Sequence, residues 1–239
     1  MTSPTKTPVT ISLAGAATFG ALAYLVGVIV PAAIQPPFPI LPYLKFDPAE
    51  IMDVSSLLIF GPIVGIVTAT IHFLILTVTS PDGNPFGPSL KYLGVLSTYG
   101  GIIVASRFGK HNLVKTGLLA TAFGIVSRVT LMTVVNYVYF VYAAQAAFGV
   151  NYQAFAKGIL QGAGFNVDGL QLIYLILGLT AIYNGLHAIL SIVGSLVIVT
   201  ALVTRVPQLL ESRSWLTKKL LLVKSSQARS NKETRPVTA

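Results

Sequence analysis

The sequence of 239 residues contains no cysteine and few charged side chains. Without cysteine the chain has no disulfide, no thiolate metal ligand and no cysteine nucleophile. Charged residues make up 10% of the chain, whereas a soluble domain carries about 25%. Only seven residues are acidic, and those before the last segment are expected near helix ends or in loops. This distribution argues against a carboxylate-driven hydrolase and against a proton relay through a membrane.

Two sequence motifs of nucleotide and metal chemistry are also missing. The sequence contains neither a GxxxxGK[ST] phosphate-binding loop nor an HExxH zinc motif. One helical bundle uses up the chain and leaves no room for a separate soluble catalytic domain. We therefore predict no catalytic residue, no metal and no cofactor, and we expect that the protein is not an enzyme. The chain alone therefore cannot supply chemical energy.

Apolar residues are abundant: 54% of the chain is hydrophobic and the mean hydropathy is +0.76. Residues 9–30, 57–79 and 117–142 contain one charged side chain between them, Arg128. Each stretch is near or above the ~20 apolar residues that cross a ~30 Å hydrocarbon core. The first stretch exceeds the apolar run of a cleaved signal peptide, and only Lys6 precedes it. The sequence therefore predicts an integral membrane protein.

Positive charge indicates the orientation of the chain in the membrane. Residues 205–239 hold eight Lys and Arg against two acids, and residues 107–115 hold three without an acid. Basic segments beside a span are typical of the cytoplasmic side, where lipids are anionic. We attribute the net charge of +9 to contact with the lipid bilayer, and expect no nucleic-acid partner. The predicted location is the cell (plasma) membrane, with multiple passes and both termini cytoplasmic.

A sharp helix start is predicted at residues 47–50. Asp47 suits the N-cap, Pro48 the first helical position, and Glu50 completes a capping box. The run from 49 to 79 has 31 residues, or about 46 Å at 1.5 Å per residue. That length is too great for one upright span, and the pair Gly61-Pro62 predicts a break.

The fold class predicted from these features is an all-α membrane protein, a compact bundle of six transmembrane helices in residues 1–206. The spans are expected at about residues 9–30, 48–60, 62–79, 89–108, 113–142 and 184–206. Residues 168–183 are expected to form a short helix that does not span, ending in a turn at Asn184-Gly185. Residues 207–239 form the basic cytoplasmic tail. Five spans, with the second helix unbroken, is the alternative.

The connector after the first span holds six of the fourteen prolines, between residues 31 and 48. No helix persists through such a segment, so we expect irregular backbone at the outer membrane surface. The connector is otherwise apolar, which favours a lid folded back over a site. The alternative is a loop that only packs on the outer surface.

Polar side chains are expected at one depth beneath this lid. Asn136 lies near the outer end of the fifth span, and Asn184 and His187 share one face at the start of the last. Buried amides and imidazoles in membranes have a protein partner or a ligand. Arg128, about mid-span, is expected to be a structural partner to backbone carbonyls or an acid. Several tyrosines could stack on a flat ring or form an interfacial belt: Tyr43, Tyr92, Tyr137, Tyr139 and Tyr183.

Four stretches, in order along most of residues 9–204, resemble one known family. They are LPYLKFDPAEI at 41–51, FGPIVG at 60–65, RVTLMTVVNY at 128–137 and NGLH at 184–187. Together they are similar to riboflavin-specific S components, the substrate-binding subunits of energy-coupling factor (ECF) transporters. The sequence departs from that family at His187, where the family has a lysine, and in lacking a proline after Asn136-Tyr137. The family's acid-and-lysine pair near the end of the third helix is replaced by residues 70–72.

The resemblance implies a six-helix bundle that captures riboflavin at its outward face as transported ligand. Its partners would be a transmembrane T subunit and two ATPase subunits, whose ATP hydrolysis drives import. Ala17 and Ala21 of the first helix would dock on the T subunit. The ligand would contact the loop and three helix positions: Leu41, Tyr43, Leu44, Lys45, Asn136, Asn184 and His187.

Other functions remain open at this point. Within the class, the chain could be an S component for another vitamin or a solitary facilitator working without ATPases. Outside it, a membrane-embedded enzyme acting on lipid or a structural assembly subunit are the alternatives. The lipid enzyme is disfavoured because the sequence shows no paired acids and no nucleophile beside a base.

Overall fold

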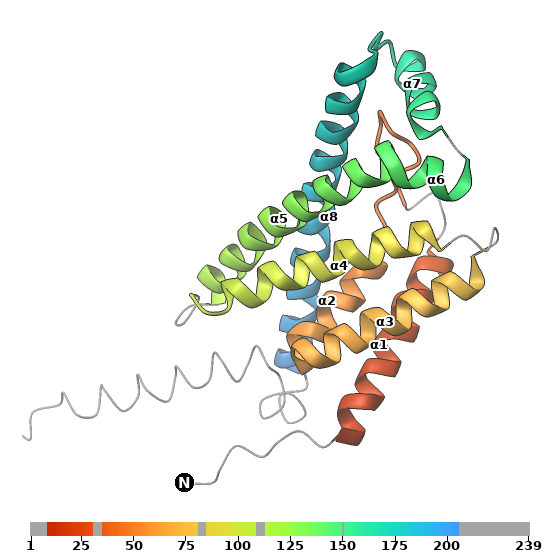
Figure 1. Cartoon of the computed structure of the whole chain (residues 1–239). Coiled ribbons are helices and arrows are strands. Elements are labelled where there is room, and N and C mark those ends of the chain that lie inside the picture. Colours follow the sequence, from red (N-terminus) through yellow and green to blue (C-terminus); the bar gives the residue numbers. More distant parts are fainter. Residues whose placement is uncertain (1–8, 31–34, 81–84, 109–112, 150, 206–239) are drawn as a thin grey trace, which may run out of the picture.

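The computed structural model describes residues 9–30, 35–80, 85–108, 113–149 and 151–205, and within them the regular structure is helical (Figure 1). The helices are α1 (Val9–Ile29), α2 (Ala49–Phe60), α3 (Pro62–Thr79), α4 (Phe86–Ala105), α5 (Leu113–Val138), α6 (Ala144–Phe148), α7 (Tyr152–Gly162) and α8 (Gly169–Arg205). A π-helical turn, η2 (Tyr139–Ala143), joins α5 to α6.

Four helical segments in the described part of the chain are long and apolar enough to span a membrane. They are Val9–Ile29, Pro62–Thr79, Val114–Ala146 and Gly169–Leu202. The 12 residues of α2 reach only about 18 Å at 1.5 Å per residue. The count of six spanning helices therefore stays a prediction. The start of α1 and the end of α8 lie at the same end of the bundle in Figure 1.

The predicted break between the second and third helices is confirmed. Gly61, with φ of 96°, separates α2 from α3, and Pro62 begins α3. This positive φ is accessible to glycine at little cost. The two helices are then joined by a buried hydrogen bond, 2.6 Å long, between the hydroxyls of Ser56 and Thr68.

The prediction of a separate helix over residues 168–183 is wrong, because α8 runs unbroken for 37 residues from Gly169 to Arg205. The Asn184-Gly185 pair, which predicts a turn in water, is here inside the helix. The Asn184 amide donates to the carbonyl of Thr180 at 2.9 Å, and Gly185 packs close to Val129 and Ile125 of α5. Because the neighbours are apolar, a break in the helix would leave backbone N–H and C=O groups without partners, and this favours an unbroken helix.

Residues 143–168, to which no element was assigned from the sequence, also contain helices. The fifth helix continues past residue 142 through η2 into α6, and α7 follows. The start of α7 is capped by Asn151, whose side chain accepts a hydrogen bond from the Ala154 amide at 3.0 Å.

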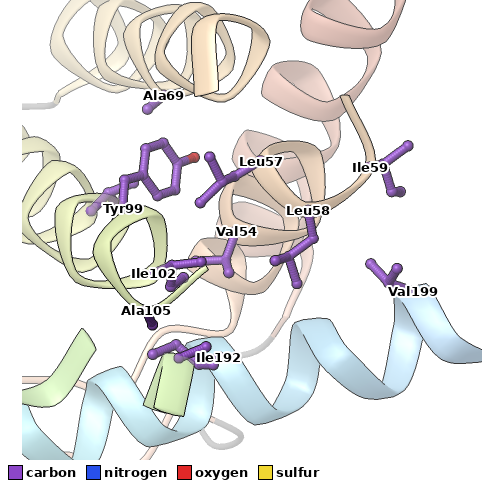
Figure 2. Packing of buried hydrophobic residues seen from close by; sticks show 12 residues of the cluster. Val54, Leu57, Leu58, Ile59, Ala69, Tyr99, Ile102, Ala105, Ile192 and Val199 are labelled. Atoms are coloured by element: carbon purple, nitrogen blue, oxygen red, sulfur yellow. The ribbon is translucent and has the colours of Figure 1, made fainter. Parts of the chain in front are cut away.

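The short helix α2 forms the centre of the bundle. Its residues Val54, Leu57 and Leu58 are at most 1% exposed. They pack with side chains of α3, α4 and α8 in one apolar cluster (Figure 2), including Ala69, Tyr99, Ile102, Ile192 and Val199. The Tyr99 hydroxyl lies among these groups and donates to the backbone oxygen of Asp53 at 2.7 Å. This core fixes the position of the α2 amino end, which carries Glu50 and Asp53.

The connector before α2 folds back onto the bundle as irregular backbone over its described part, residues 35–48. Two backbone hydrogen bonds turn it back on itself. The Phe38 N–H donates to the Leu44 carbonyl at 2.7 Å, and the Phe46 N–H donates to the Pro36 carbonyl at 3.1 Å. Phe38 and Leu41 are buried in a second apolar cluster against residues of η2, α7 and α8, among them Phe140, Ala156, Leu160, Leu172 and Ile176. The connector is thereby held at one end of the bundle.

Candidate binding cavity

A cavity of about 440 Å³ lies between the connector and α2, α4, α5, η2, α7 and α8. This volume is within the ~300–1,000 Å³ of small-molecule sites. Six of the seven residues predicted to contact a ligand line it: Tyr43, Leu44, Lys45, Asn136, Asn184 and His187. Leu41 is fully buried behind the wall, in the apolar cluster with Phe140 and Leu160. The structure brings the predicted site together, and the ligand contacts stay a prediction.

The base of the cavity is a buried ion pair between α5 and α2. Arg128 Nη1 and Nη2 donate to Glu50 Oε2 and Oε1 at 2.5 and 3.1 Å, and the two side chains are 3% and 1% exposed. Ser191 of α8 donates a further hydrogen bond to Glu50 at 3.1 Å. Gly94 of α4 leaves room for the guanidinium, since a Cβ there would lie 3.0 Å from Arg128 Nη2. Bidentate geometry and extra hydrogen bonds are what a buried ion pair requires.

Glu50 therefore does not close a capping box. The Asp47 carboxylate accepts a hydrogen bond from the Ala49 amide at 2.7 Å, as a cap does, while Glu50 turns inward to Arg128. The expectation for Arg128, an acid as structural partner, is confirmed. The guanidinium Nε also donates to Asn184 Oδ1 at 3.1 Å, so Arg128 orients one of the predicted ligand amides.

The cavity wall contains a second ion pair. Asp47 binds Lys91 of α4 through an ion pair. Two acids and two bases of the wall thus neutralise one another as Glu50–Arg128 and Asp47–Lys91. Lys45, in contrast, is an exposed side chain on the connector. Neither ion pair therefore leaves an unpaired charge facing the interior of the cavity.

His187 connects α8 to the connector through both ring nitrogens. Its Nε2 lies 3.0 Å from the backbone oxygen of Asp47, and its Nδ1 lies 2.9 Å from the Tyr183 hydroxyl. The Tyr183 hydroxyl also lies within hydrogen-bonding distance of the backbone oxygen of Lys45, at 2.6 Å. The contact with Asp47 requires a proton on Nε2, because a backbone oxygen only accepts, whereas the Tyr183 hydroxyl can donate to Nδ1 or accept from it. Glu50 Oε1 lies 3.7 Å from Nε2.

Asn136 and Asn184 have hydrogen-bonding capacity left for a ligand. Each side-chain amide donates to a backbone oxygen one turn earlier, of Met132 at 2.7 Å and of Thr180 at 2.9 Å. An amide carries two N–H donors and an oxygen with two lone pairs. One donor of each amide remains for another partner.

The opposite end of the cavity is aromatic. Ring centroids of Tyr139 and Phe140 lie 5.2 and 5.1 Å from that of Tyr152, and Tyr43 lies 6.0 Å from it. The π-helical turn places two consecutive residues, Tyr139 and Phe140, on the cavity wall. Burial raises the pKa of Tyr152 to about 12 and that of Tyr43 further, so both hydroxyls stay neutral. Of the tyrosines singled out in the sequence, Tyr43, Tyr139 and Tyr183 line the cavity.

The other two tyrosines lie elsewhere. Tyr92 stacks on Phe73 with a centroid distance of 5.2 Å and shares a hydrogen bond of 3.0 Å with Thr70. Tyr137 is 41% exposed. Neither tyrosine lines the cavity, and of the two only Tyr137 is exposed.

Sequence reasoning missed several wall residues, including Glu50, Lys91, Met132, Tyr152 and Thr180. It placed the acids at helix ends or in loops, but Glu50 and Asp53 are buried in the first turns of α2. A second pair joins Asp53 Oδ2 to His72 Nδ1 of α3 at 2.7 Å. The sequence signal that could have revealed these buried acids was the presence of Arg128 and His72 within apolar runs, because each of these side chains requires a buried partner.

Ala17 and Ala21 lie on the exposed face of α1, together with Ala14. The opposite face packs on α2 and α3 through glycines: a Cβ on Gly15 would meet Phe60 at 2.7 Å, and one on Gly20 would meet Ile71 at 2.8 Å. The alanine face is therefore available to another membrane helix. Among the described residues no group of three His, Asp or Glu side chains is arranged to hold a metal ion.

The fold is similar to a solved structure, the S component of a bacterial ECF transporter. The TM-score is 0.56 at 19% sequence identity, and the match covers 84% of this chain and 98% of that one. No family model matches the sequence. No curated protein matches it either. The fold resemblance predicted from the four sequence stretches is confirmed, and the chain has the S-component fold.

Proposed function

We propose that this chain is the substrate-binding membrane subunit of a vitamin uptake transporter, and that it captures riboflavin at its outward face. The S-component fold supports the substrate-binding role. The observation that supports riboflavin as the ligand is the cavity of about 440 Å³, which has paired charges at one end and aromatic rings at the other. Riboflavin is a neutral molecule with a flat ring system and a hydroxylated chain.

The paired charges favour a neutral ligand over a charged vitamin. A carboxylate would compete with Glu50 for Arg128, and a cation would compete with Arg128 for Glu50. Either exchange leaves one buried charge without its partner, which costs about 3–5 kcal/mol. A neutral ligand with hydroxyl groups gains hydrogen bonds from Asn136 and Asn184 without breaking the Glu50–Arg128 pair.

The aromatic end suits the ring system. Tyr43, Tyr139 and Tyr152 provide faces and edges for a flat aromatic ligand, and such contacts contribute about 0.5–1.5 kcal/mol beyond buried area. The connector residues Leu44 and Lys45 cover the cavity near His187. In this arrangement the ring lies toward α7 and the hydroxylated chain toward Arg128.

Import then requires energy from other subunits, because the sequence has no phosphate-binding loop. We propose a transmembrane T subunit and two ATPases as partners, with the exposed Ala17–Ala21 face of α1 as the contact with the T subunit. We propose that both termini are cytoplasmic; the basic residues of the 107–115 loop and of the tail support this orientation.

Riboflavin fluorescence quenching by the purified protein in mild detergent tests this proposal. We expect saturable quenching at about one ligand per chain, with competition by neutral flavins. Flavin mononucleotide, which adds a phosphate to the same skeleton, is the matched probe of charge and should compete at least tenfold more weakly. Absence of quenching, together with tight binding of a carboxylate vitamin, would contradict the proposal.

A further inference from the structure

Three tyrosines that do not line the cavity lie together on the exposed surface formed by α5, η2 and α8. Tyr137 is 41% exposed, Tyr142 60% and Tyr174 70%. The rings of Tyr137 and Tyr142 pack edge to face with their centroids 6.2 Å apart, and Tyr174 lies within electrostatic range of Tyr137. We call these three residues the tyrosine cluster. Each presents an apolar ring and a polar hydroxyl to whatever surrounds the bundle.

The exposed surface of α8 on one side of the cluster is apolar. Between Tyr174 and Arg205 the sequence has no Asp, Glu, Lys or Arg. The large side chains that α8 exposes along this stretch are aliphatic: Ile182, Leu186, Ile189, Leu190, Val193 and Val197. A continuous aliphatic face of this length suits contact with lipid chains.

The surface on the other side of the cluster is polar. Asp168, immediately before α8, forms an ion pair with Lys157 of α7, and their side chains are 75% and 36% exposed. Charged groups this exposed are costly in hydrocarbon and belong in water or among headgroups. The tyrosine cluster therefore lies at the boundary between an aliphatic surface and a charged one.

The length of α8 agrees with a membrane boundary at the cluster. Tyr174 precedes Arg205 by 31 residues of unbroken helix, which is about 46 Å at 1.5 Å per residue. A bilayer with its headgroup regions is about 40–45 Å thick, so a modest tilt brings the two lengths together. Tyrosine at one end and a basic residue at the other are typical of the two interfaces.

We propose that the tyrosine cluster is a lipid-binding surface, which lies in the phospholipid headgroup layer on the cavity side of the membrane and fixes the depth of the bundle. The rings contact the upper part of the acyl chains, and the hydroxyls bond to ester and phosphate oxygens of the headgroups. Asn184 follows Tyr174 by ten residues of α8, about 15 Å of helix. The base of the cavity is thus within the hydrocarbon layer, whereas the Lys157–Asp168 pair is outside it.

The test uses single cysteines, because the chain has none of its own. Tyr174→Cys, Leu190→Cys and Gln161→Cys carry a nitroxide spin label in phosphatidylcholine vesicles, and collision with oxygen is compared with collision with a water-soluble nickel complex. Leu190 is an exposed position deep in the aliphatic face, and Gln161 is an exposed position of α7. The oxygen-to-nickel ratio at Tyr174→Cys is expected to lie between the high ratio at Leu190→Cys and the low ratio at Gln161→Cys. A ratio equal to either reference would overturn the inference.

A second measurement tests whether the cluster sets the depth. The label is placed at Leu186→Cys, and the three tyrosines are replaced together by leucine or, as the matched control, by tryptophan, which also prefers the interface. The leucine variant is expected to shift the depth of the label by about 3 Å or more, which is two residues of helix rise, and the tryptophan variant to keep it. Unchanged depth in the leucine variant would overturn the anchoring role. No vitamin enters either measurement, so the outcome is independent of riboflavin binding.

Discussion

Arg128 of α5 and Glu50 of α2 are joined by two hydrogen bonds of 2.5 and 3.1 Å at the base of the cavity, with both side chains at most 3% exposed. The pair links the short central helix α2 to α5 across the cavity base. It also neutralises two full charges on the cavity wall. The stability of the bundle and the choice of a neutral ligand therefore depend on the same contact.

Glu50→Gln is expected to destabilise the protein by about 3–5 kcal/mol, because it leaves the Arg128 guanidinium buried without a counter-charge. Thermal unfolding in detergent measures the loss. The double variant Glu50→Gln/Arg128→Met is the control, since it removes both charges and should recover much of the stability. A double variant as unstable as Glu50→Gln alone would show that the pair is not the source of the effect.

Asn184→Ala should weaken riboflavin binding by about 1–3 kcal/mol, the cost of leaving a buried ligand group without its partner. The variant also removes the acceptor of Arg128 Nε. Isothermal titration gives the affinity. The matched control is Thr204→Ala on the same helix, whose hydroxyl donates to Thr200 at 3.0 Å far from the cavity. Equal affinities of wild type and Asn184→Ala would remove this amide from the site.

His187 is expected to make riboflavin binding depend on pH. One hydrogen bond ties its Nε2 to the connector at Asp47 and the other joins Nδ1 to Tyr183 of α8, and the groups facing the ring are Glu50, Arg128, Asp47, Lys91 and Tyr183. The neutral ring can accept from the Tyr183 hydroxyl at Nδ1, and this contribution is lost when Nδ1 is protonated as the pH falls. We expect affinity to fall as the pH drops across about 8 to 5, where histidine titrates.

His187→Lys is the control for that titration. A lysine keeps a cation with several donors at neutral pH, so its affinity should stay level over the same range. Parallel pH profiles for wild type and His187→Lys would contradict the role given to the imidazole.

His72→Leu should destabilise the bundle by about 3 kcal/mol or more, since it leaves the fully buried Asp53 carboxylate without its partner. Asp53→Asn/His72→Leu removes the charge as well and should recover part of the loss. Chemical or thermal unfolding compares the three proteins. Wild-type stability of His72→Leu would mean that Asp53 is not held by this contact.

Ala17→Leu/Ala21→Leu is expected to abolish co-purification with a T subunit and to leave riboflavin affinity unchanged. Both alanines are exposed on α1 and neither lines the cavity. Larger side chains prevent the close helix approach that small residues allow in lipid. Ile63→Phe on α3, a position 80% exposed, is the matched control. Full assembly of the alanine variant would place the docking surface elsewhere.

The sequence was informative where one local signal decides the structure. Gly61-Pro62 predicted a helix break because glycine supplies the positive φ and proline starts the next helix. Asn136, Asn184 and His187 were predicted at one depth from the order and orientation of the spans, and all three line the cavity. The role of Arg128 followed from the same argument.

Other features depend on contacts between distant segments. The Asn184-Gly185 turn was mispredicted because packing of α5 against Gly185 keeps α8 continuous. Glu50 satisfied a local capping pattern, but its partner is 78 residues away in the chain. Tyr174 has no distinctive sequence context, and only its exposed position near Tyr137 of α5 sets it apart.

The most direct test of the ligand is the visible absorption spectrum of the protein purified in mild detergent from cells grown with riboflavin. The account predicts a yellow preparation with a flavin spectrum at about one ligand per chain. A colourless preparation that also fails to quench added riboflavin fluorescence would contradict the riboflavin assignment.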